Sequence, residues 1–312
     1  MTAPGAVLET GMRRAPALLS LLALLVACDR PPAADPDYVR EIEAARAARH
    51  AELTTEDGWL TIVAREPLAP GENTFGSDPS SKIALEGTGI PPRAGAFVVR
   101  EDGGVVLRAE PGAPVTVNGG APTDAPLVPE GEERADVVTV GRVRLAYFVK
   151  DGAPYVRARD PESARLRGFP GLSHFPIDPE LRVEGRWEPY DAPRDVEVPS
   201  SRGPARTALA PGLVRFTLGG RELSLEPTVE SPDDATLFFV FADATSGSES
   251  YGGGRFLSVP RPAAGTARVV LDFNLAETPP CSLTPFASCP MALPRNTLPI
   301  RVEAGEKAPS HP

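Results

Sequence analysis

The sequence LVRFTLGGRELSLEP (residues 213–227) decides the fold class of the chain. Apolar and polar residues alternate on both sides of Gly219 and Gly220, and alternation with a period of two is typical of a strand that buries one face. Consecutive glycines tolerate the positive φ angles that a tight turn requires. The stretch therefore predicts a β-hairpin.

Similar short runs, separated by Gly, Pro, Asn and Asp, continue on both sides of this hairpin. Asp102-Gly103-Gly104 and Asn118-Gly119 are further signals for tight turns. We predict strands at the regular spacing of a β-sandwich within residues 58–64, 95–102, 104–112, 115–120, 136–141 and 142–149. Further strands, within residues 153–160, 236–243, 254–259 and 267–274, are predicted for a second β-rich region.

One segment has helical character. Residues 37–53 (DYVREIEAARAARHAEL) are rich in Ala, Glu and Arg, which favour the helix. The chain is therefore predicted to be all-β with one N-terminal helix at residues 37–54. A β-sandwich (55–151), a second β-rich domain (152–305) with a Pro-rich connection at 171–190, and a frayed tail (306–312) would follow.

Composition and charge exclude one class of function. The chain has 312 residues, with 32 Lys+Arg against 42 Asp+Glu, and a formal net charge of -10. Nucleic-acid binding depends on cationic side chains that replace phosphate counterions, so we expect no nucleic-acid partner. The 29 glycines and 37 prolines fit turn-rich β structure, and the length fits two modest domains.

The N-terminus carries a targeting pattern. Arg13 and Arg14 precede an apolar run that is too short to span a membrane and ends Leu25-Val26-Ala27-Cys28. This ending resembles the bacterial lipobox, which implies a signal peptide (1–27), lipid attachment at Cys28 and a linker (28–36). An ordinary signal peptide with a chance cysteine is the alternative, and either Met1 or Met12 is the start. We expect a protein of the bacterial cell envelope, anchored to the membrane through lipid on Cys28 and facing the periplasm or the exterior.

The other cysteines, Cys281 and Cys289, form an even pair once Cys28 is lipidated. In an oxidising compartment they predict a disulfide that closes a small loop. The spacing is not C-x-x-C and no predicted helix follows, which disfavours a redox-active pair. With three histidines and no metal-ligand spacing, we predict no metal and no cofactor.

Several motifs together resemble a bacterial and archaeal family that is known only as a domain of unknown function. They include GENTFGSDPSSKIAL (71–85), FADATSGSESYGGGRFL (241–257) and LDFNLAETPPCSLTPFASCP (271–290), within a similarity that extends over residues 38–306. The resemblance implies no particular activity.

The first half also resembles forkhead-associated (FHA) domains. TFGSDPSSKIAL (74–85), VNG (117–119) and VGRVRLAYFV (140–149) match their strand and turn motifs, which implies an FHA-like β-sandwich. Phosphothreonine binding in that family needs a turn Arg and a Ser-x-x-His motif. Here Ser77 takes the place of the Arg, and PPRAGAF (91–97) has neither Ser nor His, so we expect the scaffold without the phosphopeptide function.

Polar residues gather near predicted strand ends in the second domain, where binding groups collect on a rigid sheet. The candidate ligand-binding residues are Asp243, Glu249, Tyr251, Arg255, Asp272, Asn274 and Asn296. The alternative is that these residues cap turns and form ion pairs, for example between Arg255 and Asp272. A row of arginines at 157, 159, 165 and 167 is either an anion site or a solvated strand face.

Two classes of function remain open from the sequence. The first is a non-enzymatic envelope protein that binds a small anionic or saccharide-like ligand or an envelope protein. The second is an envelope hydrolase that uses acidic and Arg residues of the second domain. A deep pocket with perturbed carboxylates would favour chemistry, and an apolar patch would favour protein binding.

Overall fold

The structure is a computed structural model that describes residues 1–2, 5, 35–263 and 265–309. Contacts between residues divide the chain into Met1–Ala33 and a compact unit, Ala34–Pro312. Apart from residues 1–2 and 5, the predicted signal peptide lies outside the described residues, as does Cys28. No helix in the described part of the chain is long and apolar enough to span a membrane.

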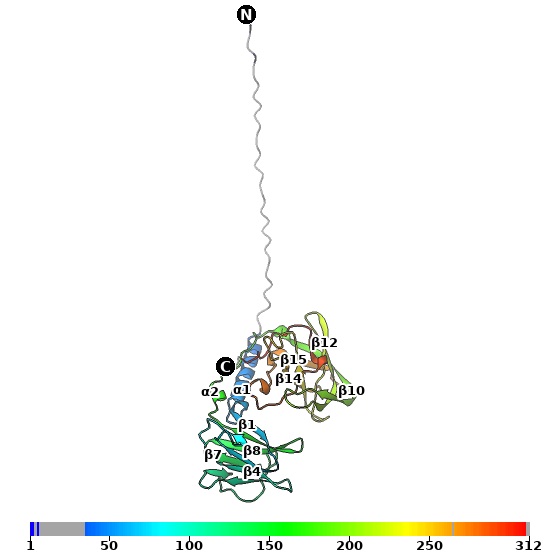
Figure 1. The fold of residues 1–312 in the computed structure, drawn as a ribbon. Helices are drawn as coiled ribbons and strands as arrows, with labels where there is room; N and C mark the ends of the chain where they lie inside the picture. The colour runs from blue at the N-terminus through cyan, green and yellow to red at the C-terminus, as the bar shows by residue number, and fades with distance from the viewer. Residues whose placement is uncertain (3–4, 6–34, 264, 310–312) are drawn as a thin grey trace. The chain divides into compact units, whose positions relative to one another are not determined.

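The predicted N-terminal helix is confirmed as α1 (Pro36–Leu53) (Figure 1). The Asp35 carboxylate accepts a hydrogen bond from the backbone N–H of Asp37 at 2.9 Å, and the fixed φ of Pro36 suits the first helical position. Ile42 and Leu53 are buried. The helix therefore has a capped start, and its inward side carries the charged Arg49 together with Ile42 and Leu53.

Residues 62–159 form two sheets whose strands pair mostly in antiparallel fashion. The five-stranded sheet has the order β1-β9-β8-β7-β6, and the four-stranded sheet has the order β3-β2-β4-β5. The strands are β1 (Ile62–Pro67), β2 (Gly71–Gly76), β3 (Ile83–Ala84), β4 (Gly95–Val99), β5 (Val105–Ala109), β6 (Val115–Val117), β7 (Val137–Val140), β8 (Val143–Lys150) and β9 (Ala153–Arg159).

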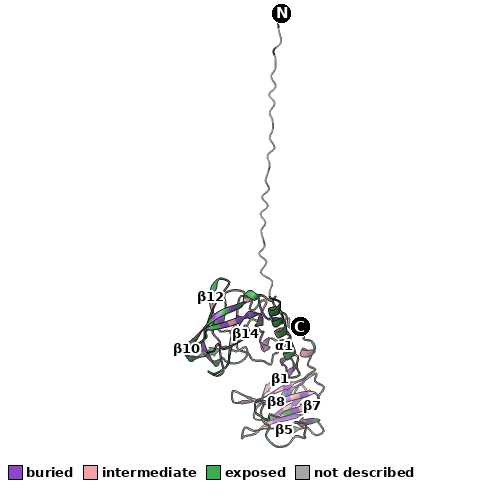
Figure 2. Cartoon of the chain, turned by 180° about the vertical axis from the view of Figure 1, so that it is seen from behind, coloured by how far each residue is buried: buried purple, intermediate pink, exposed green. Residues whose placement is uncertain are grey.

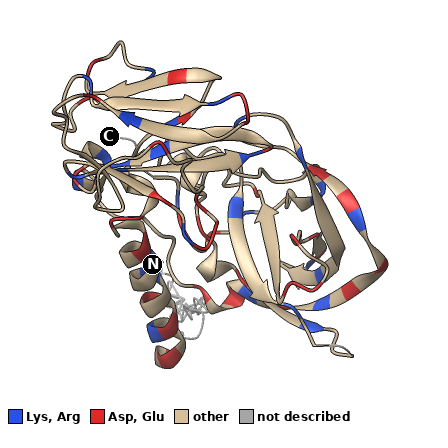
Figure 3. Ribbon diagram, turned by 90° about the horizontal axis from the view of Figure 1, so that it is seen from below, with Lys and Arg blue, Asp and Glu red and all other residues tan. Residues whose placement is uncertain are grey.

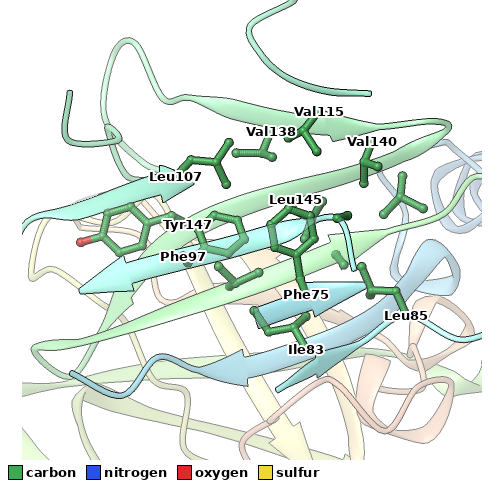
Figure 4. Close-up of a cluster of buried hydrophobic side chains, with 14 of the residues drawn as sticks. Phe75, Ile83, Leu85, Phe97, Leu107, Val115, Val138, Val140, Leu145 and Tyr147 are labelled. Carbon is green, nitrogen blue, oxygen red and sulfur yellow. The ribbon is translucent and has the colours of Figure 1, made fainter. Parts of the chain in front are cut away.

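Both sheets contribute to one apolar core, because alternate residues of each strand point inward. Phe75 and Phe97 from one sheet, and Val140 and Leu145 from the other, are completely buried in this core (Figure 4). The predicted boundary at residues 151–152 is one strand too early. Strand β9 follows it directly and pairs with both β8 and β1, which places β9 in the first pair of sheets.

Residues after 163 form a second β-rich region. A four-stranded sheet has the order β12-β11-β10-β15, and β13 pairs with β14. Its strands are β10 (Arg182–Val198), β11 (Arg206–Leu218), β12 (Arg221–Leu225), β13 (Thr236–Phe241), β14 (Arg255–Pro260) and β15 (Arg268–Asp272). Short helical turns complete the region: α2 (Ala164–Arg167), η2 (Pro179–Leu181), η3 (Phe273–Leu275), η4 (Pro280–Ser282) and η5 (Pro294–Asn296), with η1 (Trp59–Thr61) before β1.

The predicted hairpin at Gly219 and Gly220 joins β11 to β12, and both glycines have positive φ. Phe239, Phe241 and Phe273 are fully buried in the core of this region, and the strands around β14 show buried residues in Figure 2. Most phenylalanines of the chain lie in this half, and several of them contribute to its core.

The prediction of a Pro-rich connection at 171–190 is wrong for its last part. Strand β10 begins at Arg182 and continues through Pro189. Val183 and Trp187 alternate with exposed residues, which is the pattern of a half-buried strand. The pairing with β11 shifts between Pro189 and Arg194. Proline has no backbone N–H to donate to the neighbouring strand, and such an irregularity tolerates it.

The prediction of a frayed tail from residue 306 is also wrong for its first residues. Glu306 is buried, and its carboxylate accepts a hydrogen bond from the backbone N–H of Thr278 at 2.6 Å. Lys307 N–H donates to the Ser173 carbonyl at 2.8 Å. Backbone pairing and a buried carboxylate thus hold these residues in place, although the segment lacks apolar side chains.

Candidate ligand-binding site

A cavity of about 860 Å³ opens between the β10–β11 hairpin, β13 and the segment 288–290. Volumes of about 300–1,000 Å³ are typical of small-molecule sites. Most of its wall is apolar and consists of Val198, Pro199, Ala208, Leu209, Val229, Ala235, Phe238 and Pro290. Apolar walls of this size are suited to the apolar part of a small ligand.

Polar groups lie along the same cavity. Ser200, Thr228 and Ser288 contribute hydroxyl groups, and Asp195, Arg206, Glu230 and Asp234 contribute charges. Ser200 Oγ lies 2.9 Å from Ser288 Oγ. Hydrogen bonds from a few such groups would orient a ligand that the apolar wall binds.

The backbone that carries the wall is well fixed. Val229 N–H donates to the Leu209 carbonyl at 2.8 Å, and Thr228 N–H donates to the Phe238 carbonyl at 2.8 Å. The Phe238 ring meets the Phe256 ring edge to face, with centroids 4.9 Å apart. The cavity is therefore lined by paired backbone rather than by a free loop.

Another cavity, of about 910 Å³, lies against the charged face of the sheet of β10, β11, β12 and β15. Its charges largely satisfy one another, since Arg215 pairs with Glu188 at 2.9 Å and Arg268 with Glu184 at 2.7 Å. Figure 3 shows blue and red positions interspersed along the strands. This surface resembles a solvated sheet face more than a ligand site.

The structure brings two of the sequence-predicted site residues together as a buried pair. The Arg255 guanidinium, 1% exposed, contacts the Asp243 carboxylate and donates to the Val302 carbonyl at 2.8 Å. Burial lowers the pKa of Arg255, and the nearby Asp243 charge opposes that effect. The predicted pairing of Arg255 with Asp272 is wrong, because Asp243 is its partner.

Asp272 and Asn274 form a separate group that contacts α1. The Tyr38 hydroxyl donates to the Asp272 carboxylate at 2.9 Å and accepts from Asn274 Nδ2 at 2.9 Å. Burial and the hydrogen bond to Asp272 raise the pKa of Tyr38. These hydrogen bonds link α1 to η3.

The remaining predicted residues are dispersed. Asn296 is buried, and its Nδ2 donates to the carbonyls of Glu226 and Val240 at 2.9 and 3.0 Å. Glu249 pairs with Arg301 at the surface. The seven candidates thus do not converge on one cleft.

The arginine row is dispersed as well. Arg157 pairs with Glu130, and Arg165 donates to the Ile62 carbonyl at 3.0 Å. Asp160 binds Arg142 at 2.7 Å instead of an arginine of the row. In the described part of the chain, no group of three or more His, Cys, Asp or Glu side chains is arranged to hold a metal ion.

Tyr251 lies beside the two cysteines. The structure records Cys281 and Cys289 as free thiols, so the disulfide predicted from the sequence is not shown and stays a prediction. Instead, the backbone N–H of Cys281 donates to the Cys289 sulfur at 3.2 Å, and the Cys281 sulfur lies 3.6 Å from the Tyr251 hydroxyl oxygen. Cys289 also lines the 860 Å³ cavity.

Hydrogen bonding separates the acidities of the two thiols. Interaction with the Cys289 thiol, and then with the hydroxyls of Tyr251 and Ser201, lowers the pKa of Cys281 to about 6 against the opposing effect of burial. The same contact with Cys281, together with burial, raises the pKa of Cys289. Burial and the contact with Cys281 raise the pKa of Tyr251 to about 12.

Comparison with known proteins identifies the relationship of the second region. The family described as "Protein of unknown function (DUF1684)" matches residues 167–307. The chain belongs to this family. The DUF1684 match includes the cavity, both thiols and all seven candidate residues, and it confirms the resemblance seen in the sequence for residues 167–307.

A solved relative is the uncharacterized protein from a gene locus of Haloarcula marismortui, determined by solution NMR. It is 34% identical, and the alignment covers 47% of this chain and 82% of that chain, with a TM-score of 0.40. No curated protein matches the chain.

Sequence patterns did not indicate the cavity within the DUF1684 region. Leu209, Val229 and Phe238 come from separate segments, and each looks like an ordinary strand residue in isolation.

Proposed function

We propose that this chain is a lipid-anchored protein of the bacterial cell envelope that binds a small, partly apolar ligand without chemical conversion. The observation that carries the proposal is the 860 Å³ cavity with its apolar wall and hydroxyl groups. The N-terminal pattern that ends in Cys28 supports the anchored location.

The contacts of the acidic residues support binding over catalysis. Asp243 is committed to Arg255, and Asp272 to Tyr38. The hydrolase alternative needs acidic and Arg groups that are free to face a substrate, and no specific contact favours it.

We further propose that residues 62–159 serve as a scaffold related to FHA domains. Two sheets over a common core support the relationship. In this resemblance Ser77 takes the turn position of the phosphate-binding Arg, so that position lacks the guanidinium that would pair with a phosphate.

The ligand proposal predicts that Phe238→Ala weakens binding of an apolar fluorescent probe such as anilinonaphthalene sulfonate. Loss of the aromatic wall should raise the Kd about tenfold, which corresponds to about 1.4 kcal/mol. Fluorescence titration of the folded full-length chain measures this change.

Phe256→Ala is the matched control, since it removes the same ring contact from the opposite side and Phe256 does not belong to the cavity wall. Its Kd should stay within about twofold of the parent. Equal weakening by both substitutions, or no saturable binding by the parent, would contradict the cavity as the site.

A further inference from the structure

Cys281 and Cys289 lie at the two ends of a loop that is tied to the chain after β10. Ser201 N–H donates to the Cys289 carbonyl at 2.9 Å, and Cys289 N–H donates to the Ser201 hydroxyl at 3.0 Å. Met291 N–H donates to the Pro199 carbonyl at 2.8 Å. These bonds hold Cys289 in place. The hydrogen bond from the Cys281 backbone N–H to the Cys289 sulfur holds the two ends of the loop together.

The two thiols differ in access. Cys289 is 5% exposed, while Cys281 is partly exposed. A reagent in solution therefore meets Cys281 first. The buried Cys289 is close enough to react with Cys281, because the Cys289 sulfur accepts a hydrogen bond from the Cys281 backbone N–H.

The surroundings of Cys281 stabilise a thiolate. The hydroxyl of Tyr251 lies 3.6 Å from its sulfur, and the Ser201 hydroxyl and the Cys289 thiol are further hydrogen-bonding neighbours. Hydrogen bonds to the charged form favour it over the neutral thiol. Arg202 is a positively charged neighbour of the site, and its guanidinium lowers the pKa of Tyr251.

We propose that Cys281 is a reactive thiol site, with Cys289 as its resolving partner, for thiol–disulfide exchange with small dialkyl disulfides. The Cys281 thiolate attacks one sulfur of the disulfide RSSR, which forms a mixed disulfide and releases RS⁻. Cys289 then loses its proton to RS⁻ and attacks the Cys281 sulfur, which releases the second RS⁻; this takes a proton from water. The protein pair is oxidised to an intramolecular disulfide, and RSSR is reduced to two thiols.

This role differs from the structural disulfide predicted from the sequence, which would stay closed. Cys281 is not among the residues that line the cavity, whereas its partner Cys289 is, so the two proposals share one residue.

The first test measures alkylation of the reduced full-length chain by iodoacetamide between pH 5 and 9, with peptide mapping to assign each cysteine. Cys281 should reach half of its maximal rate near pH 6, and Cys289 should remain unlabelled. A half-maximal rate at or above about pH 8.5, the value of an ordinary thiol, would overturn the proposal.

The second test adds oxidised glutathione. The parent should form the intramolecular disulfide and release two equivalents of glutathione, whereas Cys289→Ser should retain one glutathione on Cys281. Dithiothreitol should reopen the parent disulfide in the folded protein. A disulfide that reduces only after unfolding, or glutathione that attaches to Cys289 in Cys281→Ser faster than to Cys281 in Cys289→Ser, would show that Cys281 is not the exchanging thiol.

Tyr251→Phe tests the hydroxyl as a positioning group. The phenyl ring is kept and only the hydroxyl near the Cys281 sulfur is lost, so the midpoint of the alkylation profile should rise by at least about half a pH unit. An unchanged midpoint would remove Tyr251 from the thiol site.

Discussion

Arg49 shows how single residues manage buried charge in this chain. Its side chain is 9% exposed, and it contacts Glu52 at 3.0 Å, Glu277 at 3.5 Å and Glu306 at 3.6 Å. Burial lowers the pKa of Arg49, but the carboxylates outweigh it and raise the pKa overall. Several partners are needed because a charge removed from water is stable only when it is paired.

Within this cluster, the pKa of Glu306 is raised by its burial. Burial raises its pKa from 4.5 to about 7, although the Thr278 N–H and Arg49 oppose the shift. The folded chain therefore binds a proton more tightly than the unfolded chain between these values. Stability from this group is complete below about pH 4.5 and is lost as the pH rises through about 7.

Glu306→Gln should reduce the decline in the free energy of unfolding between pH 5 and 8 by up to about 3 kcal/mol, because the amide keeps an oxygen acceptor and cannot ionise. Urea unfolding at several pH values measures this. Glu303→Gln, at an exposed glutamate that pairs with Arg301, is the control and should leave the decline unchanged. An undiminished decline in Glu306→Gln would refute the assignment.

At the scale of elements, β10 and β11 form the long hairpin on which the cavity depends. Their register changes between Pro189 and Arg194, so the two strands continue past residues that cannot complete the ladder. Gly212 lies opposite Pro189, and a Cβ there would stand 2.5 Å from the Glu188 carbonyl oxygen and 2.6 Å from the Trp187 ring. The close approach of the strands at this point requires glycine.

Gly212→Ala should therefore destabilise the protein by about 1–3 kcal/mol, as expected for overpacking against backbone. The midpoint of urea unfolding checks it. Gly120→Ala is the control, since a Cβ at Gly120 meets only the Val117 carbonyl oxygen at an ordinary 3.5 Å. A Gly212→Ala midpoint equal to that of the parent would mean that the strands adjust without cost.

Elements with a regular local pattern were predictable from the sequence. The α1 helix and the β11–β12 hairpin are confirmed by the structure. Both could be predicted because their sequence signals lie within a few consecutive residues. Strand β10 was missed because its prolines masked an alternating pattern. The neighbours of Cys281 were not predictable, since Tyr251 and Ser201 come from distant segments that only the folded chain brings together.

For the whole molecule, the anchored location that we propose from the N-terminal sequence pattern can be tested directly. Cys28→Ser should move the protein from the membrane to the soluble fraction and abolish incorporation of labelled fatty acid, because stable anchoring requires more than one acyl chain. Cell fractionation and lipid labelling measure both effects. Cys281→Ser, which keeps Cys28, should remain anchored and labelled; membrane binding of Cys28→Ser equal to the parent would refute the anchor.

The contact between Arg49 and Glu306 joins the first helix to the last residues of the described chain. Closing so long a loop has an entropic cost, although that cost grows only slowly with loop length. A chain truncated before Glu306 would therefore leave Arg49 without the most buried of its three carboxylate partners.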